Sequence, residues 1–284
     1  MSEVKERLEA MVEKMPAFPA SVSTILDITS DINCAPKDLV KVIELDPVLT
    51  MKVLKLVNSA YFGLSREVTS VKHSVVYVGI NTIKNVAISI AAIGVLPHTS
   101  SSGYNLDQFL QHSLSTAAIA RLLARSKGVP ESDLGDYFVA SLLHDIGQMV
   151  VGQYMPDEFQ SALAICNEQE IPICEAEREI FGIDHAEIGA MLAESWQLPA
   201  ALISCIRNHH QVGELEEPTV LEKTIFIANQ VSKLMGGDRS GLSQQEPVPE
   251  VVSSWLGMPV SEVADSLNGL DEEIEKCNIF IQNN

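Results

Sequence analysis

Basic residues are scarce in this chain. Lys and Arg together number 19 against 38 Asp and Glu, and the formal net charge at pH 7 is −19. A surface of this charge repels the phosphate backbones of nucleic acids and the anionic headgroups of lipids unless a local basic patch exists. The sequence has no cluster of Lys or Arg that would form such a patch. We therefore expect neither a nucleic-acid partner nor a membrane partner.

Cysteines are also few, and they are scattered. No CxxC pair occurs among the five, which are Cys34, Cys166, Cys174, Cys205 and Cys277. This spacing offers neither a zinc knuckle nor a thioredoxin-like motif. An odd, unclustered set of cysteines is typical of reduced thiols in a cytosolic protein.

Long apolar runs are absent as well. The longest nearly apolar run, Val86–Leu96, falls well short of the roughly 20 residues that a membrane-spanning helix needs. Residues 1–15 mix charged and apolar residues at helical spacing and lack the apolar region of a signal peptide. We expect a cytoplasmic protein.

What the chain does have is helical periodicity. Apolar residues make up 46% of the 284 residues, which is enough for a sizeable core. They recur every three or four positions, as in Leu39, Val42 and Ile43. Asp46-Pro47 predicts a helix start, with a capping carboxylate before a proline. Because the N-terminal half shows no convincing strand alternation, we predict an all-α fold.

Composition divides the chain into three parts. The polar stretch 97–105 (PHTSSSGYN) predicts a boundary between an N-terminal helical subdomain, residues 1–100, and a second helical unit, residues 101–235. Residues 236–249 hold Gly, Ser, Gln and Pro with little apolar content and predict a mobile loop. With the amphipathic helix expected at 259–277, they make up the third part, residues 236–284.

Histidines gather in the second part. His144 is followed by Asp145 within the apolar stretch SLLHDIGQMVV, and a buried Asp is rare unless it is paired or bound to a metal. Side chains of consecutive helical residues point about 100° apart. A metal beside the helix can still collect both, with ligands from other helices. The other histidines of this part are His112, His185, His209 and His210.

Structural roles stay open for the same residues. A His-Asp pair can be held in a core by a neighbouring hydroxyl or lysine, without any metal. His209 and His210 are adjacent, so we expect at most one of them to face a given site. His73 and His98 lie outside the cluster and are expected to be surface or structural residues.

Several motifs recur together along the chain. LLHDIG follows His112 and precedes GIDHAEIGAMLAESWQLP and IRNHHQ, while the N-terminal half holds MPAFPAS, KLVNSAYFG and GINTIKN. Together they resemble the HDOD family, the HD-related output domains of bacterial signalling proteins. The resemblance runs from about Met15 to Gln211. It implies a multi-helical HD-like domain preceded by the N-terminal helical subdomain.

The resemblance also implies a metal site. HDOD domains are similar in fold to the HD phosphohydrolases, whose metal ligands are a His, a His-Asp pair and a later Asp. On this chain they match His112, His144-Asp145 and Asn229, and Asp145 is the implied catalytic residue. An amide at Asn229 in place of a carboxylate should weaken the site. His185 and His209 or His210 match the extra histidines of two-metal phosphodiesterases.

These residues and the resemblance are compatible with three alternative functions. The first is a signal-transduction output domain, catalytically weak or inactive, that binds a signalling protein partner or a small phosphorylated ligand. The alternative is a metal-dependent phosphohydrolase or phosphodiesterase of the HD type, although the GYP signature of cyclic-dinucleotide phosphodiesterases is absent. The implied cofactor is a divalent iron, manganese, magnesium or zinc ion, and no organic cofactor is expected. A third reading is an interaction scaffold, in which the terminal helices pair between chains to give a homo-oligomer.

Overall fold

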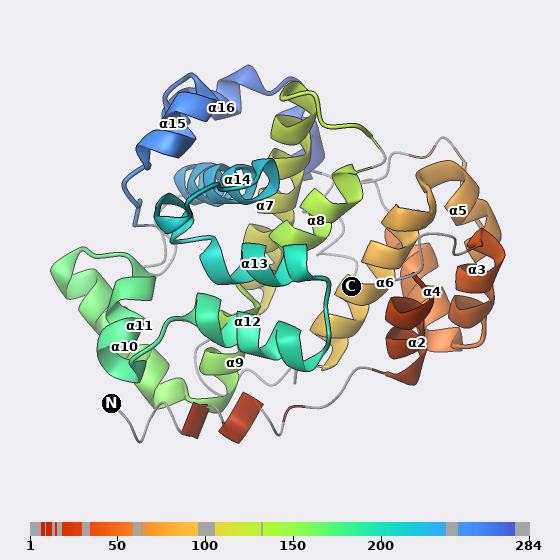
Figure 1. Ribbon diagram of the computed structural model, residues 1–284, viewed down its shortest axis with the longest axis horizontal. Coiled ribbons are helices and arrows are strands. Elements are labelled where there is room, and N and C mark those ends of the chain that lie inside the picture. Colours follow the sequence, from red (N-terminus) through yellow and green to blue (C-terminus); the bar gives the residue numbers. More distant parts are fainter. Residues whose placement is uncertain are drawn as a thin grey trace.

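The computed structural model describes residues 7–8, 10–12, 15, 19–29, 35–58, 64, 66–95, 106–131, 133–236 and 244–275 (Figure 1). These residues form helices and loops and contain no strand, so the predicted all-α fold is confirmed. The helices are α2 (Ala20–Thr29), α3 (Pro36–Glu44), α4 (Pro47–Val57), α5 (Val71–Val78), α6 (Ile80–Val95), α7 (Leu106–Ser126), α8 (Leu134–Leu143), α9 (Ile146–Tyr154), α10 (Pro156–Gln169), α11 (Ile173–Phe181), α12 (His185–Ser195), α13 (Ala200–Asn208), α14 (Val220–Gly236), α15 (Glu250–Leu256) and α16 (Val260–Ser266), with a 3-10 turn, η1 (Val212–Glu214).

Helices α2–α5 lie to one side of the remaining helices, and α6 joins them to the rest (Figure 1). The predicted start of α4 is confirmed, because the Asp46 carboxylate accepts hydrogen bonds from the N–H groups of Val48 (3.1 Å) and Leu49 (3.0 Å). Helix α6 packs against α8, and the buried apolar side chains of both parts belong to one continuous core. The boundary predicted at residues 97–105 lies outside the described residues.

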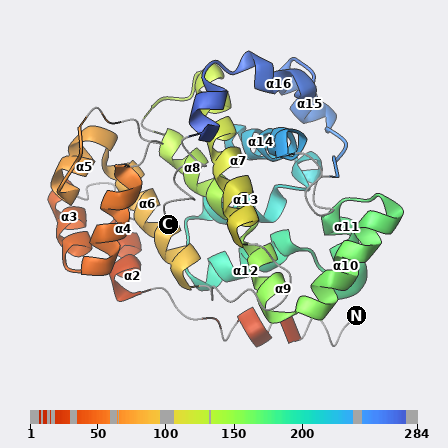
Figure 2. The ribbon, with the colours of Figure 1, turned by 180° about the vertical axis from the view of Figure 1, so that it is seen from behind.

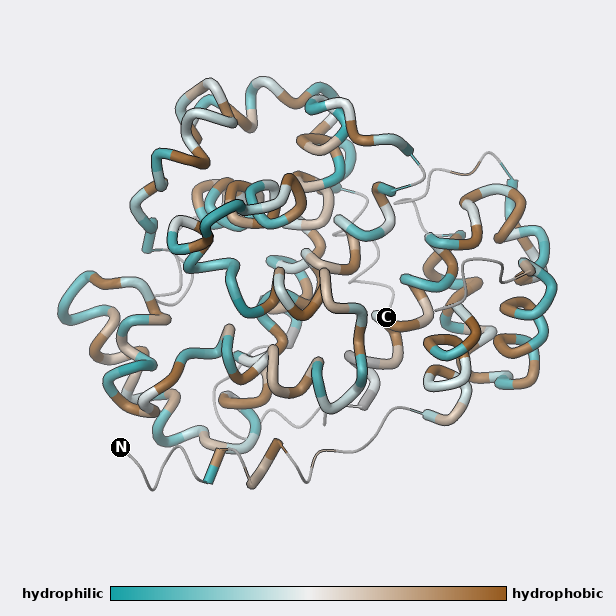
Figure 3. The backbone as a smooth tube through the Cα atoms, in the orientation of Figure 1, coloured by the Kyte–Doolittle hydropathy of each residue, from teal (hydrophilic) through white to brown (hydrophobic). Residues whose placement is uncertain are grey.

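Helix α7 is central to the second part. It packs along both α8 and α14, while α12 packs against α9 and α13. Figure 2 shows α7 from behind, with α8 on one side and α14 on the other. Apolar and polar segments alternate along most helices (Figure 3). This amphipathic pattern is the one that buries one face of each helix against its neighbours.

The structure differs from the prediction at His144-Asp145. The pair does not lie within a helix, because α8 ends at Leu143, α9 begins at Ile146, and Asp145 has φ −96° and ψ 14°. Because the regular helix is interrupted at this point, the side chains of His144 and Asp145 need not diverge as they would on a regular helix. Both can therefore face one point.

The C-terminal part also differs from the prediction. The helix expected at 259–277 is interrupted, since α16 ends at Ser266 and Gly269 takes a φ of +82° before helix resumes at Leu270. A left-handed residue cannot continue an α-helix. Within the predicted mobile loop, residues 237–243 lie outside the described residues, but the side chain of Glu246 is only 7% exposed and contacts α14.

No single helix in the described ranges combines the length and the apolar character that crossing a membrane requires. Val71–Val78 and Ile80–Ala91 reach that threshold only as a pair, and they are bent by 119° relative to each other.

Candidate metal centre

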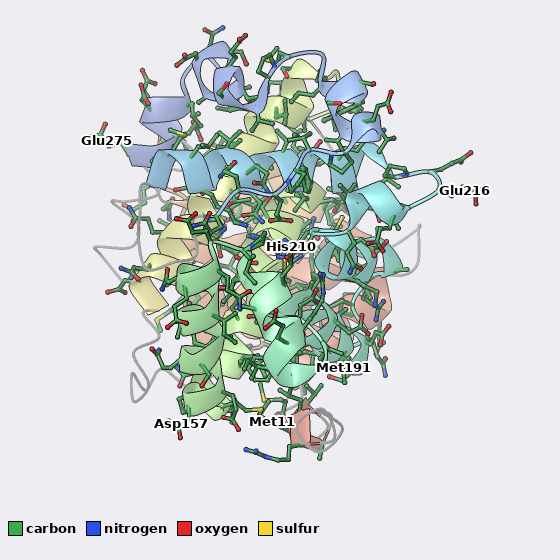
Figure 4. All side chains as sticks on the ribbon, turned by 90° about the vertical axis from the view of Figure 1, so that its left-hand side faces the viewer. Met11, Asp157, Met191, His210, Glu216 and Glu275 are labelled. Carbon is green, nitrogen blue, oxygen red and sulfur yellow. The ribbon has the colours of Figure 1, made fainter. Side chains whose placement is uncertain are left out.

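Six predicted site residues converge in the interior of the second part. They come from α7 (His112), the junction of α8 and α9 (His144 and Asp145), the start of α12 (His185) and the turn after α13 (His209 and His210). Figure 4 shows the labelled His210 near the centre of the view, whereas the labelled Asp157 and Glu216 lie at its periphery. His73 is exposed on α5, as expected, and His98 lies outside the described residues.

The Asp145 carboxylate divides these histidines into two donor groups. In the first group its Oδ2 lies 3.3 Å from Nε2 of His112 and 3.2 Å from Nε2 of His144. In the second group its Oδ1 lies 3.1 Å from Nε2 of His185 and 3.2 Å from Nε2 of His209. The Nε2 of His210 lies 2.8 Å from that of His185. One carboxylate therefore offers one oxygen to each group.

Both histidines of the HH pair belong to the second group, contrary to the expectation that at most one would face a site. Helix α13 ends at Asn208, and His209 and His210 lie in the turn that follows. Outside a regular helix, adjacent side chains are not held about 100° apart.

Backbone carbonyls fix the ring orientation of two of these histidines. The Nδ1 of His144 donates to the carbonyl of Ser141 (2.6 Å), and the Nδ1 of His209 donates to that of Ile206 (2.7 Å). A carbonyl oxygen only accepts, so each neutral ring must carry its proton on Nδ1 and leave Nε2 bare. Burial, together with the neighbouring His210, lowers the pKa of His209 to about 3, so this ring is neutral.

Asp145, in contrast, is ionised. Burial opposes its charge, but the surrounding imidazoles outweigh this effect and hold its pKa well below the usual range. The bare Nε2 of His209 therefore faces a negative carboxylate oxygen, and two lone pairs meet without a proton between them. A cation placed between the two atoms turns this repulsion into attraction.

Two further histidines are supported by carboxylates. Oε2 of the fully buried Glu177 lies 2.6 Å from Nδ1 of His185 and accepts from the His185 N–H at 2.8 Å. Burial disfavours charge on His185, but Glu177 and Asp145 outweigh it and raise the pKa of His185 to about 10. Positive charge beside these carboxylates is therefore favoured, whether a proton on this ring or a bound cation supplies it. Glu246 supports His210 in the same way, 2.8 Å from its Nδ1.

The donor set fits divalent metal ions. The Asp145 oxygens lie 3.1–3.3 Å from the histidine nitrogens of their groups. This separation is the one expected between neighbouring ligands that each lie about 2.0–2.2 Å from one ion. Each metal-directed imidazole also has a second partner at its other nitrogen, which is the usual surrounding of a metal-bound histidine.

Asn229 is buried on α14, and neither its Oδ1 nor its Nδ2 has a hydrogen-bond partner in the described part of the chain. It lies one turn before Ser232, whose hydroxyl is 3.2 Å from Nδ1 of His112, so both residues share the face of α14 that meets the first donor group. A buried amide without a partner is costly. An amide oxygen is also a suitable ligand for a hard cation.

Sequence reasoning did not identify Glu177, Ser232 or Glu246. Glu177 could have been found, because it interrupts the apolar stripe of Ile173, Cys174 and Phe181 on α11 with a charge. No comparable signal marks Glu246, which lies in a polar segment, or Ser232, which is an ordinary helical serine.

Comparison with known protein sequences identifies a relative that covers most of this chain. An uncharacterized protein of Treponema pallidum (strain Nichols) is 29% identical over 246 residues, or 86% of this chain and 46% of that protein. The chain thus spans about half the length of this relative.

Solved structures show the same fold. A protein from Shewanella amazonensis SB2B that is provisionally named a phosphohydrolase superposes with a TM-score of 0.75 at 23% identity, covering 96% of this chain and 97% of that one. An HDOD domain protein of unknown function from Geobacter sulfurreducens superposes with a TM-score of 0.73 at 24% identity, covering 100% and 97%. The sequence model of the HDOD domain matches residues 15–212, which include every histidine and the aspartate of the two donor groups. The chain belongs to the HDOD family.

Proposed function

We propose that this HDOD protein is a metal-dependent phosphohydrolase of the HD type that acts in signal transduction. One observation carries the proposal: the Nε2 atoms of four histidines converge on the ionised carboxylate of Asp145 at 3.1–3.3 Å, while Nδ1 of His144 and of His209 is already bonded to a backbone carbonyl. The bare Nε2 of neutral His209 has no proton to offer Oδ1 of Asp145, so a cation between the two atoms would satisfy both of them.

Each donor group would hold one divalent ion. His112, His144 and one oxygen of Asp145 form the first site, and His185, His209, His210 and the other oxygen form the second. Such ions activate water as a nucleophile and neutralise charge on phosphoryl oxygens. The Shewanella protein, which shares the fold, is provisionally named a phosphohydrolase.

Residues of the chain itself orient the histidine rings and supply the negative charge of the centre. The carbonyls of Ser141 and Ile206 and the carboxylates of Glu177 and Glu246 keep the proton of each ring away from the donor atoms. Asp145 supplies the shared negative charge. His112 has the most exposed side chain of the six, at 23%, so we place the approach of a phosphate ester beside it.

A second candidate is an output domain that holds metal without turnover. Two observations favour it: the side chains of His144, His185, His209 and His210 are at most 2% exposed, and Asn229 provides an amide where the HD pattern has a carboxylate. Such a domain would convey its metal-bound state to a signalling protein partner.

His144→Ala tests the centre directly. We expect the purified variant to lose about one equivalent of metal per chain relative to the wild type, because the first group loses one of its three donors. Elemental analysis after purification without affinity metal or chelator measures this loss. Far-ultraviolet circular dichroism checks that the helical fold persists, and His112→Ala, at a more exposed position, serves as a second variant.

His73→Ala is the matched control, because it removes an exposed imidazole distant in sequence from the centre. Its metal content should equal that of the wild type. A wild-type protein without metal after reconstitution with iron or manganese would refute the proposal. Metal without hydrolysis of bis(p-nitrophenyl) phosphate would establish the second candidate instead.

Asn229→Asp tests the first donor group by a substitution that should strengthen metal binding, whereas His144→Ala should weaken it. A carboxylate restores the negative charge that a divalent ion favours, so we expect Mn²⁺ affinity at the first group to rise on the order of tenfold. Without metal, the buried charge should lower thermal stability. Isothermal titration with Mn²⁺ and thermal melts with and without the ion measure both effects. Unchanged or weaker affinity would show that Asn229 does not adjoin the ion.

A further inference from the structure

Residues 244–249, which connect α14 to α15, lie against the second donor group, although the HDOD match ends at residue 212. Gln245 and Glu246 of this segment contact Gln230 and Lys233 of α14. Pro249 lies so close to η1 that a Cβ on Gly213 would be 2.8 Å from its ring. This contact holds the connecting segment against the turn that directly follows His209 and His210.

Glu246 is the anchor of this segment. Its Oε1 accepts from Nζ of Lys233 (2.9 Å) and from Nε2 of Gln230 (3.0 Å), both on α14. Its backbone N–H donates to Oε1 of Gln230 at 3.1 Å. Its other carboxylate oxygen, Oε2, lies 2.8 Å from Nδ1 of His210. One carboxylate therefore joins the connecting segment, α14 and the second donor group.

The contact with His210 has a chemical consequence at the other side of the ring. When Nδ1 of His210 donates to Glu246, a neutral ring presents a bare Nε2, which lies 2.8 Å from Nε2 of His185. The Nδ1 of His185 is likewise engaged, by Glu177. Two nitrogens oriented in this way are positioned to share one cation.

We infer that Glu246 is a positioning residue for the second metal ion: it orients His210 through Nδ1, and so makes the segment beyond the HDOD match part of the centre. This inference rests on the proposed function. Glu246 acts through His210 and is not itself a ligand. Although Cys174, His210 and Glu246 form a third cluster of donor atoms, the ammonium of Lys233 already lies against this carboxylate and disfavours a further cation there.

The test compares four proteins by isothermal titration with Mn²⁺, with the Mn²⁺ electron paramagnetic resonance signal as a second readout. In Glu246→Gln we expect the second-group step to weaken about tenfold, and in Glu246→Ala about a hundredfold, the range typical when a partner behind a metal-bound histidine is lost. The step assigned to the first group should change less than about twofold. Glu250→Gln, which removes an exposed carboxylate four residues along the chain, is the matched control and should titrate as the wild type.

A double variant separates positioning from charge balance. If Glu246 only neutralises Lys233, then Glu246→Gln combined with Lys233→Met should restore wild-type Mn²⁺ affinity, and that result would overturn the inference. If Glu246 positions His210, the double variant stays as weak as Glu246→Gln. Equal affinities of wild type and Glu246→Ala would also overturn the inference and leave the proposed function standing. A wild type that binds no Mn²⁺ at all would refute the proposed function itself.

Discussion

Asp145→Asn is expected to abolish metal binding at both donor groups while the protein stays folded. The carboxylate places one oxygen in each group, so a single substitution removes the shared negative charge from both sites. The amide keeps the shape of the side chain, and its NH₂ can donate to a bare imidazole nitrogen. We expect affinity for each ion to fall at least about 100-fold, or about 3 kcal/mol.

Isothermal titration with Mn²⁺ measures this loss, and hydrolysis of bis(p-nitrophenyl) phosphate should fall with it. Asp157→Asn, at an exposed position on α10, is the control. Retention of one full equivalent of metal would show that Asp145 does not bridge the two groups.

Gly147→Ala is expected to have the largest effect on stability. A Cβ at this position would lie 1.9 Å from the carbonyl oxygen of His185 and 2.8 Å from the backbone nitrogen of Gly189. Both obstacles are backbone atoms of α12, so no side chain can rotate away and the two helices must separate. We expect a loss of about 3 kcal/mol in the free energy of unfolding.

Urea denaturation measures this change. Displacement of His185 should also weaken Mn²⁺ binding at the second group but spare the first. Gly236→Ala is the matched control, since nothing lies within 4 Å of a Cβ at that position, and its stability should remain within about 0.5 kcal/mol of the wild type. Wild-type stability in Gly147→Ala would mean that α9 and α12 do not approach so closely.

Much of the fold was predictable because helical periodicity and local capping are properties of short stretches of chain. The Asp46-Pro47 start of α4 depends on a carboxylate that reaches the N–H groups two and three residues on, and the stop of α5 depends on Gly79 at a φ of +88°. The break at His144-Asp145 was not predictable in this way. Its stretch is apolar and shows helical periodicity in the sequence, whereas in the structure α8 packs against α6, α7, α13 and α14, and α9 packs against α12.

For the candidate site, too, the residue types were predictable from the sequence and their arrangement was not. By itself, the sequence determined the all-α fold class, the membership in the HDOD family through its motifs, and the histidines and aspartate that could bind metal. Only the tertiary structure decided that both His209 and His210 face the centre, that Asp145 lies between two donor groups, and that Glu177 and Glu246 stand behind two of the rings. The physical reason is that a residue type reveals which donor atoms are present, whereas their convergence depends on contacts between distant segments, such as Ser232 with His112, 120 residues apart, which no local pattern encodes.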